Sequence, residues 1–273
     1  MRVVNHAWFF DVDGVITDLQ MKKTDPKIFA ELIKRLEKGE PVVLITGRSL
    51  DWTTKNVLKF LISLVPDEKL LDRLIVSAEF GGVLLKFQNG EKDIFIDRKL
   101  VAPKNVLEKF KEIVENDFYD SMVFEDDKLV IATAEKRDNY PLKAFREAQT
   151  GLVDKLRQLM DVEKVHGFEV HADSIGTNIR HKNANKSTAT KKILKWLAQK
   201  NISVSNFVVI GDSLFDLEIG LKLQAENLDF KFVFVGDRKM IKEQNLPFPL
   251  TFTQNLYEKG TLEYLTSHQT SKT

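Results

Sequence analysis

Four separate stretches of this 273-residue chain share one pattern, a short run composed mainly of apolar residues, many of them β-branched or aromatic, that stops abruptly at glycine, threonine or aspartate. The runs are AWFF (7–10), PVVLIT (41–46), NFVVIG (206–211) and FKFVFVG (230–236). A run without polar alternation is typical of a parallel β-strand whose two faces are both covered by helices. Segments with helical spacing lie between these runs, so we predict an α/β fold with a Rossmann-like, doubly wound parallel sheet.

The pattern changes between residues 81 and 181, where short strand pairs alternate with two helices expected at about 103–116 and 141–160. The order is ββαββαββ, and its first pair is GGVLLKF and KDIFID around an Asn-Gly turn. We therefore predict an inserted α+β domain. The expected domains are 1–80 plus 182–273 for the α/β core and 81–181 for the insert.

Composition limits the classes of function. Lysine and arginine total 41 against 40 acidic residues, a formal charge of +1 that favours neither nucleic acid nor an anionic membrane as partner. The absence of cysteine excludes disulfides, thiolate metal sites and a cysteine nucleophile. No stretch approaches 18 apolar residues, so no membrane span is expected and a cytoplasmic location is predicted. The polar residues 266–273 are expected to fray, and the oligomeric state is left open.

Polar residues gather where the predicted strands end. In open parallel sheets, ligands bind beyond the carboxyl ends of the strands, where the winding direction reverses. We therefore expect the polar groups at these ends to share one rim. The residues are Asp11 and Asp13 after the first strand, Thr46, Gly47 and Arg48 after the second, Asp212 and Asp216 after the strand at 206–211, and Lys186 at the start of the preceding helix.

These residue types point to metal-assisted phosphate chemistry. Asp11, Asp212 and Asp216 would repel one another strongly unless a cation lay among them. Oxygen ligands without cysteine or histidine favour Mg²⁺, the usual partner of a phosphoryl group. A carboxylate can also attack phosphorus as a nucleophile. The alternative is structural, because Asp-x-Asp-Gly is also a good turn and Thr-Gly a good helix cap.

Four segments, taken together and in this order, resemble the motifs of the haloacid dehalogenase (HAD) superfamily phosphatases. They are FFDVDGVITD, VVLITGRS, NKSTATKKIL and VVIGDSLFDLEIG. The resemblance covers the whole α/β core. It implies that Asp11 is the nucleophile and a Mg²⁺ ligand, and that Asp13 is the general acid/base and lends its backbone carbonyl to the metal. It also makes Asp212 a metal ligand that Asp216 supports through water.

The same resemblance assigns the phosphate-binding residues, which are Thr46, Gly47 and Lys186. Three positions depart from the family pattern. Ser187 follows the lysine where the family usually has glycine, and Leu214-Phe215 precede Asp216 where the family often has asparagine or threonine. These two departures concern the substrate class rather than the reaction. Phe80 in AEFGG stands where relatives often have asparagine, which removes a polar group from the hinge between core and cap.

The insert resembles the C2-type cap, in particular the C2B variety of the trehalose-phosphate, sucrose-phosphate and mannosyl-phosphoglycerate phosphatases. Such a cap chooses the leaving group, so some of its polar residues are candidates for substrate contact. For each candidate a structural role is the alternative, such as a surface ion pair or a polar position on a half-exposed sheet. The candidates are Glu169, His171 and Arg180 in the insert and Arg48 and Asn185 in the core.

We therefore expect a Mg²⁺-dependent phosphomonoester hydrolase that works through an aspartyl-phosphate, with a sugar phosphate or similar small phosphorylated metabolite as substrate. Two alternatives keep the same residues. A phosphomutase of the phosphomannomutase kind would return the phosphoryl group to its substrate, and a non-catalytic relative would only bind a sugar phosphate. A receiver-type signalling domain also uses Asp, Thr and Lys, but it is much shorter and needs no insert.

Overall fold

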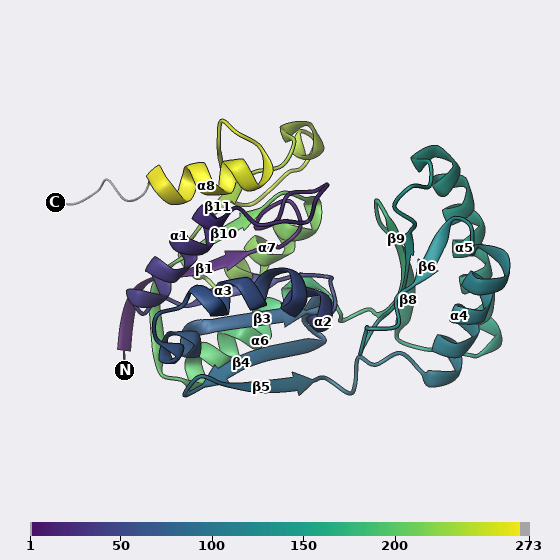
Figure 1. The fold of residues 1–273 in the computed structure, drawn as a ribbon, viewed down its shortest axis with the longest axis horizontal. Helices are drawn as coiled ribbons and strands as arrows, with labels where there is room; N and C mark the ends of the chain where they lie inside the picture. Colours follow the sequence, from purple (N-terminus) through teal and green to yellow (C-terminus); the bar gives the residue numbers. More distant parts are fainter. Residues whose placement is uncertain (1, 268–273) are drawn as a thin grey trace. The chain divides into compact units, whose positions relative to one another are not determined.

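The computed structural model describes residues 2–267, which form two compact units (Figure 1). The first unit consists of Met1–Phe95 and Asn185–Thr273, and the second of Ile96–Ala184. The predicted fraying of residues 266–273 lies, from residue 268 on, outside the described residues.

The first unit is built on an eight-stranded sheet in the order β12-β11-β10-β1-β2-β3-β4-β5. All strands from β12 to β3 run parallel, and β4 runs antiparallel to β3. The chain winds outward from β1 through β2 to β3, then returns to the other side of β1 with β10. The strands are β1 (Arg2–Phe10), β2 (Val42–Ile45), β3 (Leu74–Ala78), β4 (Val83–Gln88), β5 (Glu91–Ile96), β10 (Ile202–Gly211), β11 (Phe230–Phe234) and β12 (Leu250–Phe252).

Helices cover both faces of this sheet, as the unbroken apolar strands require. They are α1 (Pro26–Glu37), α2 (Leu50–Thr53), α3 (Lys59–Leu64), α6 (Lys186–Gln199), α7 (Leu217–Ala225) and α8 (Tyr257–Ser267). A π-helical stretch, Thr54–Leu58, joins α2 to α3. Asp25 caps α1 by accepting a hydrogen bond from the Lys27 N–H, and Pro26 occupies the first turn, where its missing N–H costs nothing.

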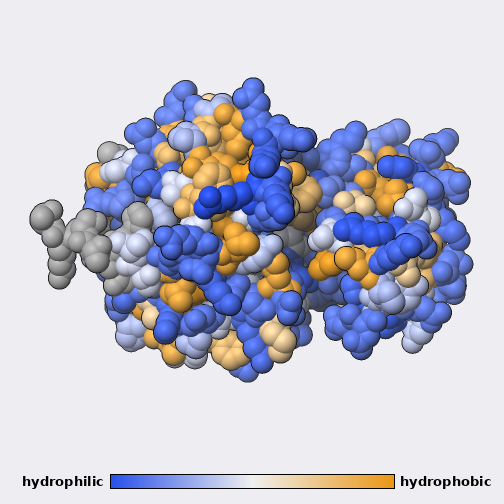
Figure 2. Space-filling view, turned by 90° about the horizontal axis from the view of Figure 1, so that it is seen from above, coloured by the Kyte–Doolittle hydropathy of each residue, from blue (hydrophilic) through white to orange (hydrophobic). Residues whose placement is uncertain are grey.

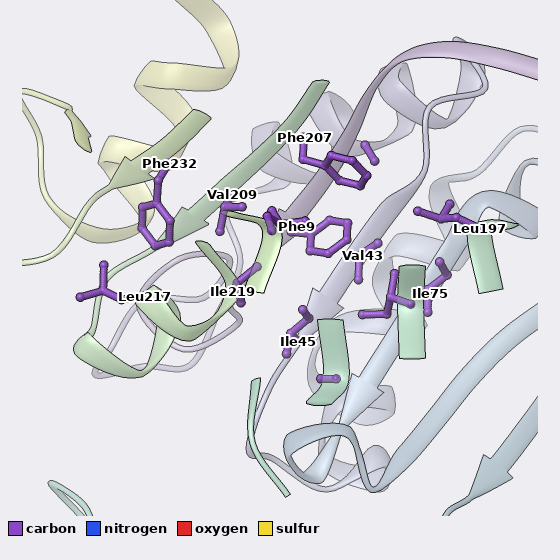
Figure 3. Packing of buried hydrophobic residues seen from close by; sticks show 14 of the residues in the cluster. Phe9, Val43, Ile45, Ile75, Leu197, Phe207, Val209, Leu217, Ile219 and Phe232 are labelled. Atoms are coloured by element: carbon purple, nitrogen blue, oxygen red, sulfur yellow. The ribbon is translucent and has the colours of Figure 1, made fainter. Parts of the chain in front are cut away.

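Strand alternation divides the core between the two faces. Phe9 of β1, Val43 of β2 and Val209 of β10 point toward α6 and α7 and pack with Ile219 and Leu197 (Figure 3). Their neighbours along each strand point to the opposite face and are equally buried. The central strands are therefore fixed from both sides, which holds the loops at their carboxyl ends in place.

The second unit has a four-stranded antiparallel sheet in the order β6-β7-β9-β8, with two helices packed on one face (Figure 1). Phe110, Phe145 and Ile179 lie in the core between helices and sheet. The elements are α4 (Lys104–Asp117), β6 (Met122–Phe124), β7 (Ala132–Lys136), α5 (Leu142–Val162), β8 (Phe168–Ala172) and β9 (Gly176–His181).

The expectation that residues 81–95 belong to the insert is wrong. β4 pairs with β3 and extends the sheet of the first unit, because Val83, Leu84 and Leu85 are buried there. The second unit therefore begins at Ile96 rather than at residue 81 and has the order αββαββ. The Asn-Gly turn indicated a hairpin, but a hairpin signal does not tell which sheet the pair joins. The short strand β12 was not predicted.

The face shown in Figure 2 is mainly hydrophilic, with hydrophobic residues in patches between hydrophilic ones. None of the helices in the described part of the chain combines the length and the apolar character needed to cross a membrane.

Candidate active site

The carboxyl ends of three neighbouring strands bring the predicted polar residues together. Asp11 directly follows β1, and its N–H donates to the Ile210 carbonyl of β10 at 3.1 Å. Thr46 follows β2 and Asp212 follows β10. Since β1 lies between β2 and β10, these residues occupy adjacent positions on one edge of the sheet.

Lys186 joins the carboxylates into a buried charge cluster. Its ammonium nitrogen lies 2.6 Å from Asp11 Oδ1 and also donates to Asp216 Oδ1. The side chain of Lys186 is 4% exposed. One carboxylate oxygen from each of Asp11, Asp212 and Asp216 lies within 4.8 Å of the others. The convergence expected from the sequence is therefore present, with one cation facing three acids.

Asp216 holds two other members of this cluster, Lys186 and Asp212, in place through hydrogen bonds. Its Oδ2 accepts hydrogen bonds from the N–H of Asp212 at 3.0 Å, and from the N–H and hydroxyl of Ser213 at 2.9 and 2.8 Å. Its Oδ1 accepts from Lys186. Because both oxygens are engaged and the residue is fully buried, Asp216 fixes the backbone that carries Asp212. Its support of a metal through water stays a prediction.

Burial shifts the pKa values of the two remaining acids upward. Burial is the main cause that raises the pKa of Asp11 to about 7, against the attraction of Lys186. Burial, followed by repulsion from Asp216 and Asp11, raises the pKa of Asp212 to about 9. Burial would lower the pKa of Lys186, but Asp11 and Asp216 outweigh it and raise that pKa. The positive charge that the protein itself supplies therefore does not offset the effect of burial on Asp11 and Asp212.

The donor set fits a hard divalent cation. The cluster offers carboxylate oxygens only, and the chain contains no cysteine. Mg²⁺ and Ca²⁺ prefer oxygen ligands, and Mg²⁺ is usually held by one or two carboxylates plus water and phosphate. A dication among Asp11 and Asp212 would offset the repulsion that raises their pKa values. The residues present thus suit the cofactor expected from the sequence.

Asp13 lies in the loop after β1 and is held by two cations. Arg48 Nε donates to Asp13 Oδ2 at 3.1 Å, Arg48 Nη2 donates to Oδ1 at 3.1 Å, and Lys22 Nζ donates to Oδ1 at 3.1 Å. Burial would raise the pKa of Asp13, but Arg48 and then Lys22 outweigh it and lower that pKa. Asp13 is therefore ionised in the free protein at neutral pH, the form that accepts a proton.

Thr46 is oriented by the same loop. Its hydroxyl oxygen accepts a hydrogen bond from the Arg48 N–H at 3.0 Å. The hydroxyl hydrogen therefore points away from that bond and is available to donate to a ligand oxygen. This geometry suits the phosphate contact expected of Thr46.

A strained turn supports the loop formed by Thr46, Gly47 and Arg48. Glu79, Phe80 and Gly81 have φ of +49°, +53° and +86°, a conformation that costs about 1 kcal/mol or more for each non-glycine residue. The N–H groups of Glu79 and Phe80 donate to the carbonyls of Arg48 and Thr46, both at 3.0 Å. The Phe80 ring lies so close to Gly47 that a Cβ there would meet Phe80 Cζ at 2.5 Å.

We predict that Gly47→Ala destabilises the protein by about 1–3 kcal/mol through this clash. Phe80→Ala in the same chain should recover much of that loss, because it removes the opposing ring. Denaturant unfolding of the two single variants and the double variant measures the coupling between the sites. Additive effects would show that the ring does not limit the space at residue 47.

The start of α6 uses Asn185 as its cap. The Asn185 side-chain oxygen accepts from the Thr188 N–H at 2.8 Å, and Glu218 Oε2 accepts from the Lys186 N–H at 2.9 Å. Sequence reasoning missed Glu218 and Lys22. Neither has a local signal, since each acts on a residue of another segment. The predicted substrate contact of Asn185 stays a prediction beside this capping role.

The three candidates of the insert lie together on the second unit's sheet. Glu169 on β8 is opposite Arg180 on β9, and Arg180 Nε donates to Glu169 Oε1 at 3.1 Å. His171 Nδ1 lies 3.5 Å from Arg180 Nη2. The intervening residues Val170 and Ile179 point to the helices, so the three polar side chains occupy the opposite face.

Comparisons with known proteins bear on the fold. No protein-family model matches the chain, and no curated protein matches it. The structure resembles the trehalose-6-phosphate phosphatase of Aspergillus fumigatus, with a TM-score of 0.58 and 16% identity over 98% of this chain and 93% of the other. It also resembles the C-terminal domain of the C. albicans trehalose-6-phosphate phosphatase, with a TM-score of 0.64 and 19% identity over 96% and 91% of the two chains.

A third similar structure is a haloacid dehalogenase-like hydrolase from Bacteroides thetaiotaomicron. It has a TM-score of 0.65 and 12% identity over 97% of this chain and all of the other (100%). These likenesses extend over nearly the whole chain. The protein therefore has the fold of the haloacid dehalogenase-like hydrolases, and the predicted fold class, a doubly wound α/β core with an additional α+β unit, is confirmed.

Proposed function

We propose that this protein is a Mg²⁺-dependent phosphomonoester hydrolase acting on a sugar phosphate or a similar small phosphorylated metabolite. The observation that carries the proposal is the buried contact of Lys186 with Asp11 beside Asp212, at the carboxyl edge of the sheet. A lysine and a hydroxyl for phosphate oxygens, a carboxylate nucleophile and a second acid are the groups that phosphoryl transfer requires.

In the proposed first step, a carboxylate oxygen of Asp11 attacks phosphorus and the bond from phosphorus to the alcohol oxygen breaks. The electron pair passes to that oxygen, which takes a proton from the carboxyl group of Asp13. A bound phosphate brings negative charge close to Asp13 and so favours its protonated form. Lys186 and the Thr46 hydroxyl bind the phosphoryl oxygens as charge develops on them.

In the second step, water attacks the phosphorus of the aspartyl-phosphate and the bond to Asp11 breaks. Asp13, now a carboxylate, takes a proton from the water. Asp11, Asp212 and the backbone carbonyl of Asp13 would hold Mg²⁺, which supplies positive charge for the phosphoryl oxygens when bound. Asp216 keeps Lys186 and the Asp212 backbone in position.

The proposed substrate class rests on two kinds of support. Two of the similar structures are trehalose-6-phosphate phosphatases by name. The polar face formed by Glu169, His171 and Arg180 offers donors and acceptors that suit the hydroxyl groups of a sugar, and we propose these residues as substrate contacts. A phosphomutase would use the same core residues, so product analysis for free phosphate against an isomer belongs to the test.

We predict Mg²⁺-dependent release of phosphate from p-nitrophenyl phosphate and from at least one member of a sugar-phosphate panel. EDTA should abolish this activity, and added Mg²⁺ should restore it. Mg²⁺ should also raise the melting temperature of the wild-type protein but not of Asp212→Asn, because that variant lacks a ligand. Asp93→Asn, an exposed acid of β5, should keep the wild-type response. Activity that survives EDTA, or its complete absence from the panel, would refute the proposal.

A further inference from the structure

Arg48 links the two halves of the candidate site. Its guanidinium contacts both oxygens of Asp13 through Nε and Nη2, each at 3.1 Å. Its backbone N–H donates to the hydroxyl oxygen of Thr46 at 3.0 Å. Arg48 thus contacts Thr46, the residue expected to bind phosphate, through its main chain, and Asp13, the expected acid/base, through its side chain.

The side chain of Arg48 is itself held in place. Its guanidinium carbon lies 4.8 Å from the centre of the Trp52 ring, a stacking contact that restricts the planar group. The side chain is 10% exposed, whereas that of Asp13 is 26% exposed. Two parallel N–H bonds from a fixed plane set the plane of the bound carboxylate. Lys22 adds a single contact, to Oδ1, and does not set that plane.

We propose that Arg48 is the positioning residue that orients Asp13 toward the leaving-group oxygen of a phosphate held at Thr46. The inference rests on the proposed phosphatase function and adds a role to a residue that the sequence offered only as an ion pair or a substrate contact. Asp13 gives its proton to the alcohol oxygen as the bond between phosphorus and that oxygen breaks. The carboxylate of Asp13 that remains is the form that the Arg48 guanidinium binds through Nε and Nη2 in this structure.

The inference predicts an effect that depends on the leaving group. Phenyl phosphate and p-nitrophenyl phosphate have nearly the same shape, but phenolate is the poorer leaving group and needs the proton of a general acid more. The parameter kcat/KM reports only the steps up to release of the alcohol, so it isolates the proton donation from the later attack of water. The ratio of kcat/KM for the two esters is therefore the readout.

Arg48→Met should lower kcat/KM for phenyl phosphate by about 10²-fold and for p-nitrophenyl phosphate by about tenfold or less, since general acid catalysis contributes about 10²–10⁴-fold. Sugar phosphates should follow phenyl phosphate or fall further. Asp13→Asn should show the same change in ratio, and Arg48→Met added to Asp13→Asn should change the ratio no further. Lys55→Met is the control, because it removes an exposed cation of the same unit outside the site, and its ratio should stay near the wild-type value. Lys22→Met keeps the two-point contact of Arg48 with Asp13, so it should change the ratio less than Arg48→Met does.

Arg48→Lys keeps the charge and most of the volume but loses the two-point contact with Asp13. It should therefore shift the ratio of kcat/KM for the two esters in the same direction, even if Arg48→Met folds poorly. The Mg²⁺-induced rise in melting temperature checks that each variant retains the metal site. Equal loss for both esters in Arg48→Met and Arg48→Lys would overturn the inference and assign Arg48 to phosphate binding or to folding. Failure of the proposed function would be distinct, because the wild-type protein would then hydrolyse neither ester.

Discussion

Replacing Asp11 by asparagine is expected to lower kcat by at least about 10⁴-fold while the protein stays folded, because removal of a nucleophile costs catalysis on this scale. Asparagine fills the same space, so the packing at the end of β1 is kept. The change also removes one of three carboxylates that repel one another in a buried site. Lys186 retains Asp216 as partner. Phosphate release and thermal unfolding, measured on the same preparation, test both halves of the expectation.

In EDTA, the melting temperature of Asp11→Asn should equal or exceed that of the wild type, since a buried acid with a raised pKa weakens the folded state when it ionises. In Mg²⁺ the order should reverse, because the variant loses a ligand. Asp93→Asn provides the control for loss of an acid on the surface of the same unit. Activity of Asp11→Asn within tenfold of the wild type would exclude the aspartyl-phosphate route.

Replacing Lys186 by methionine should give the largest loss of stability, about 3–5 kcal/mol, because it leaves buried carboxylates without their cation. Lys186 is buried and pairs with both Asp11 and Asp216. Activity should fall as well, since the phosphoryl oxygens lose their lysine. Denaturant unfolding of the metal-free protein measures the stability change.

Two further variants separate loss of charge from loss of packing. Lys186→Met combined with Asp216→Asn should recover part of the stability, because the second change removes an uncompensated charge. Lys55→Met removes the exposed ion pair with Asp51 in the same unit and should cost less than about 1 kcal/mol. If Lys186→Met proved as mild as Lys55→Met, the buried cluster would not be the electrostatic centre described above.

The positions of the main site residues could be predicted from the hydrophobic pattern of the strands. An unbroken apolar run predicts a strand buried on both faces, and the first polar residue after it must lie at the carboxyl edge of a parallel sheet. This reasoning predicts that Asp11, Thr46 and Asp212 lie together, and in the structure they follow adjacent strands. Their catalytic roles stay predictions.

What the sequence did not predict depends on pairing between distant segments. Asp13, the partner of Arg48, lies 35 residues away from it in sequence. Lys22, which also contacts Asp13, is a loop residue with a φ of +55°. Residues 83–96 showed a hairpin pattern, which is local, whereas membership of the larger sheet depends on contact with β3. The sequence predicts Asp216 as a member of the metal site, but it gives no sign of the hydrogen bonds that Asp216 accepts from the N–H groups of Asp212 and Ser213.

The most direct test of the account is to trap the covalent intermediate. The enzyme is mixed with p-nitrophenyl phosphate and Mg²⁺, quenched in acid during the first turnover, and reduced with borohydride, which converts an aspartyl-phosphate to homoserine. Mass spectrometry of the peptide that spans β1 and its following loop then locates the reduced residue. We predict homoserine at position 11 and nowhere else, with none when Mg²⁺ is withheld. Homoserine at another aspartate, or phosphate release with no modified residue at any time in the turnover, would contradict the claim that Asp11 attacks phosphorus.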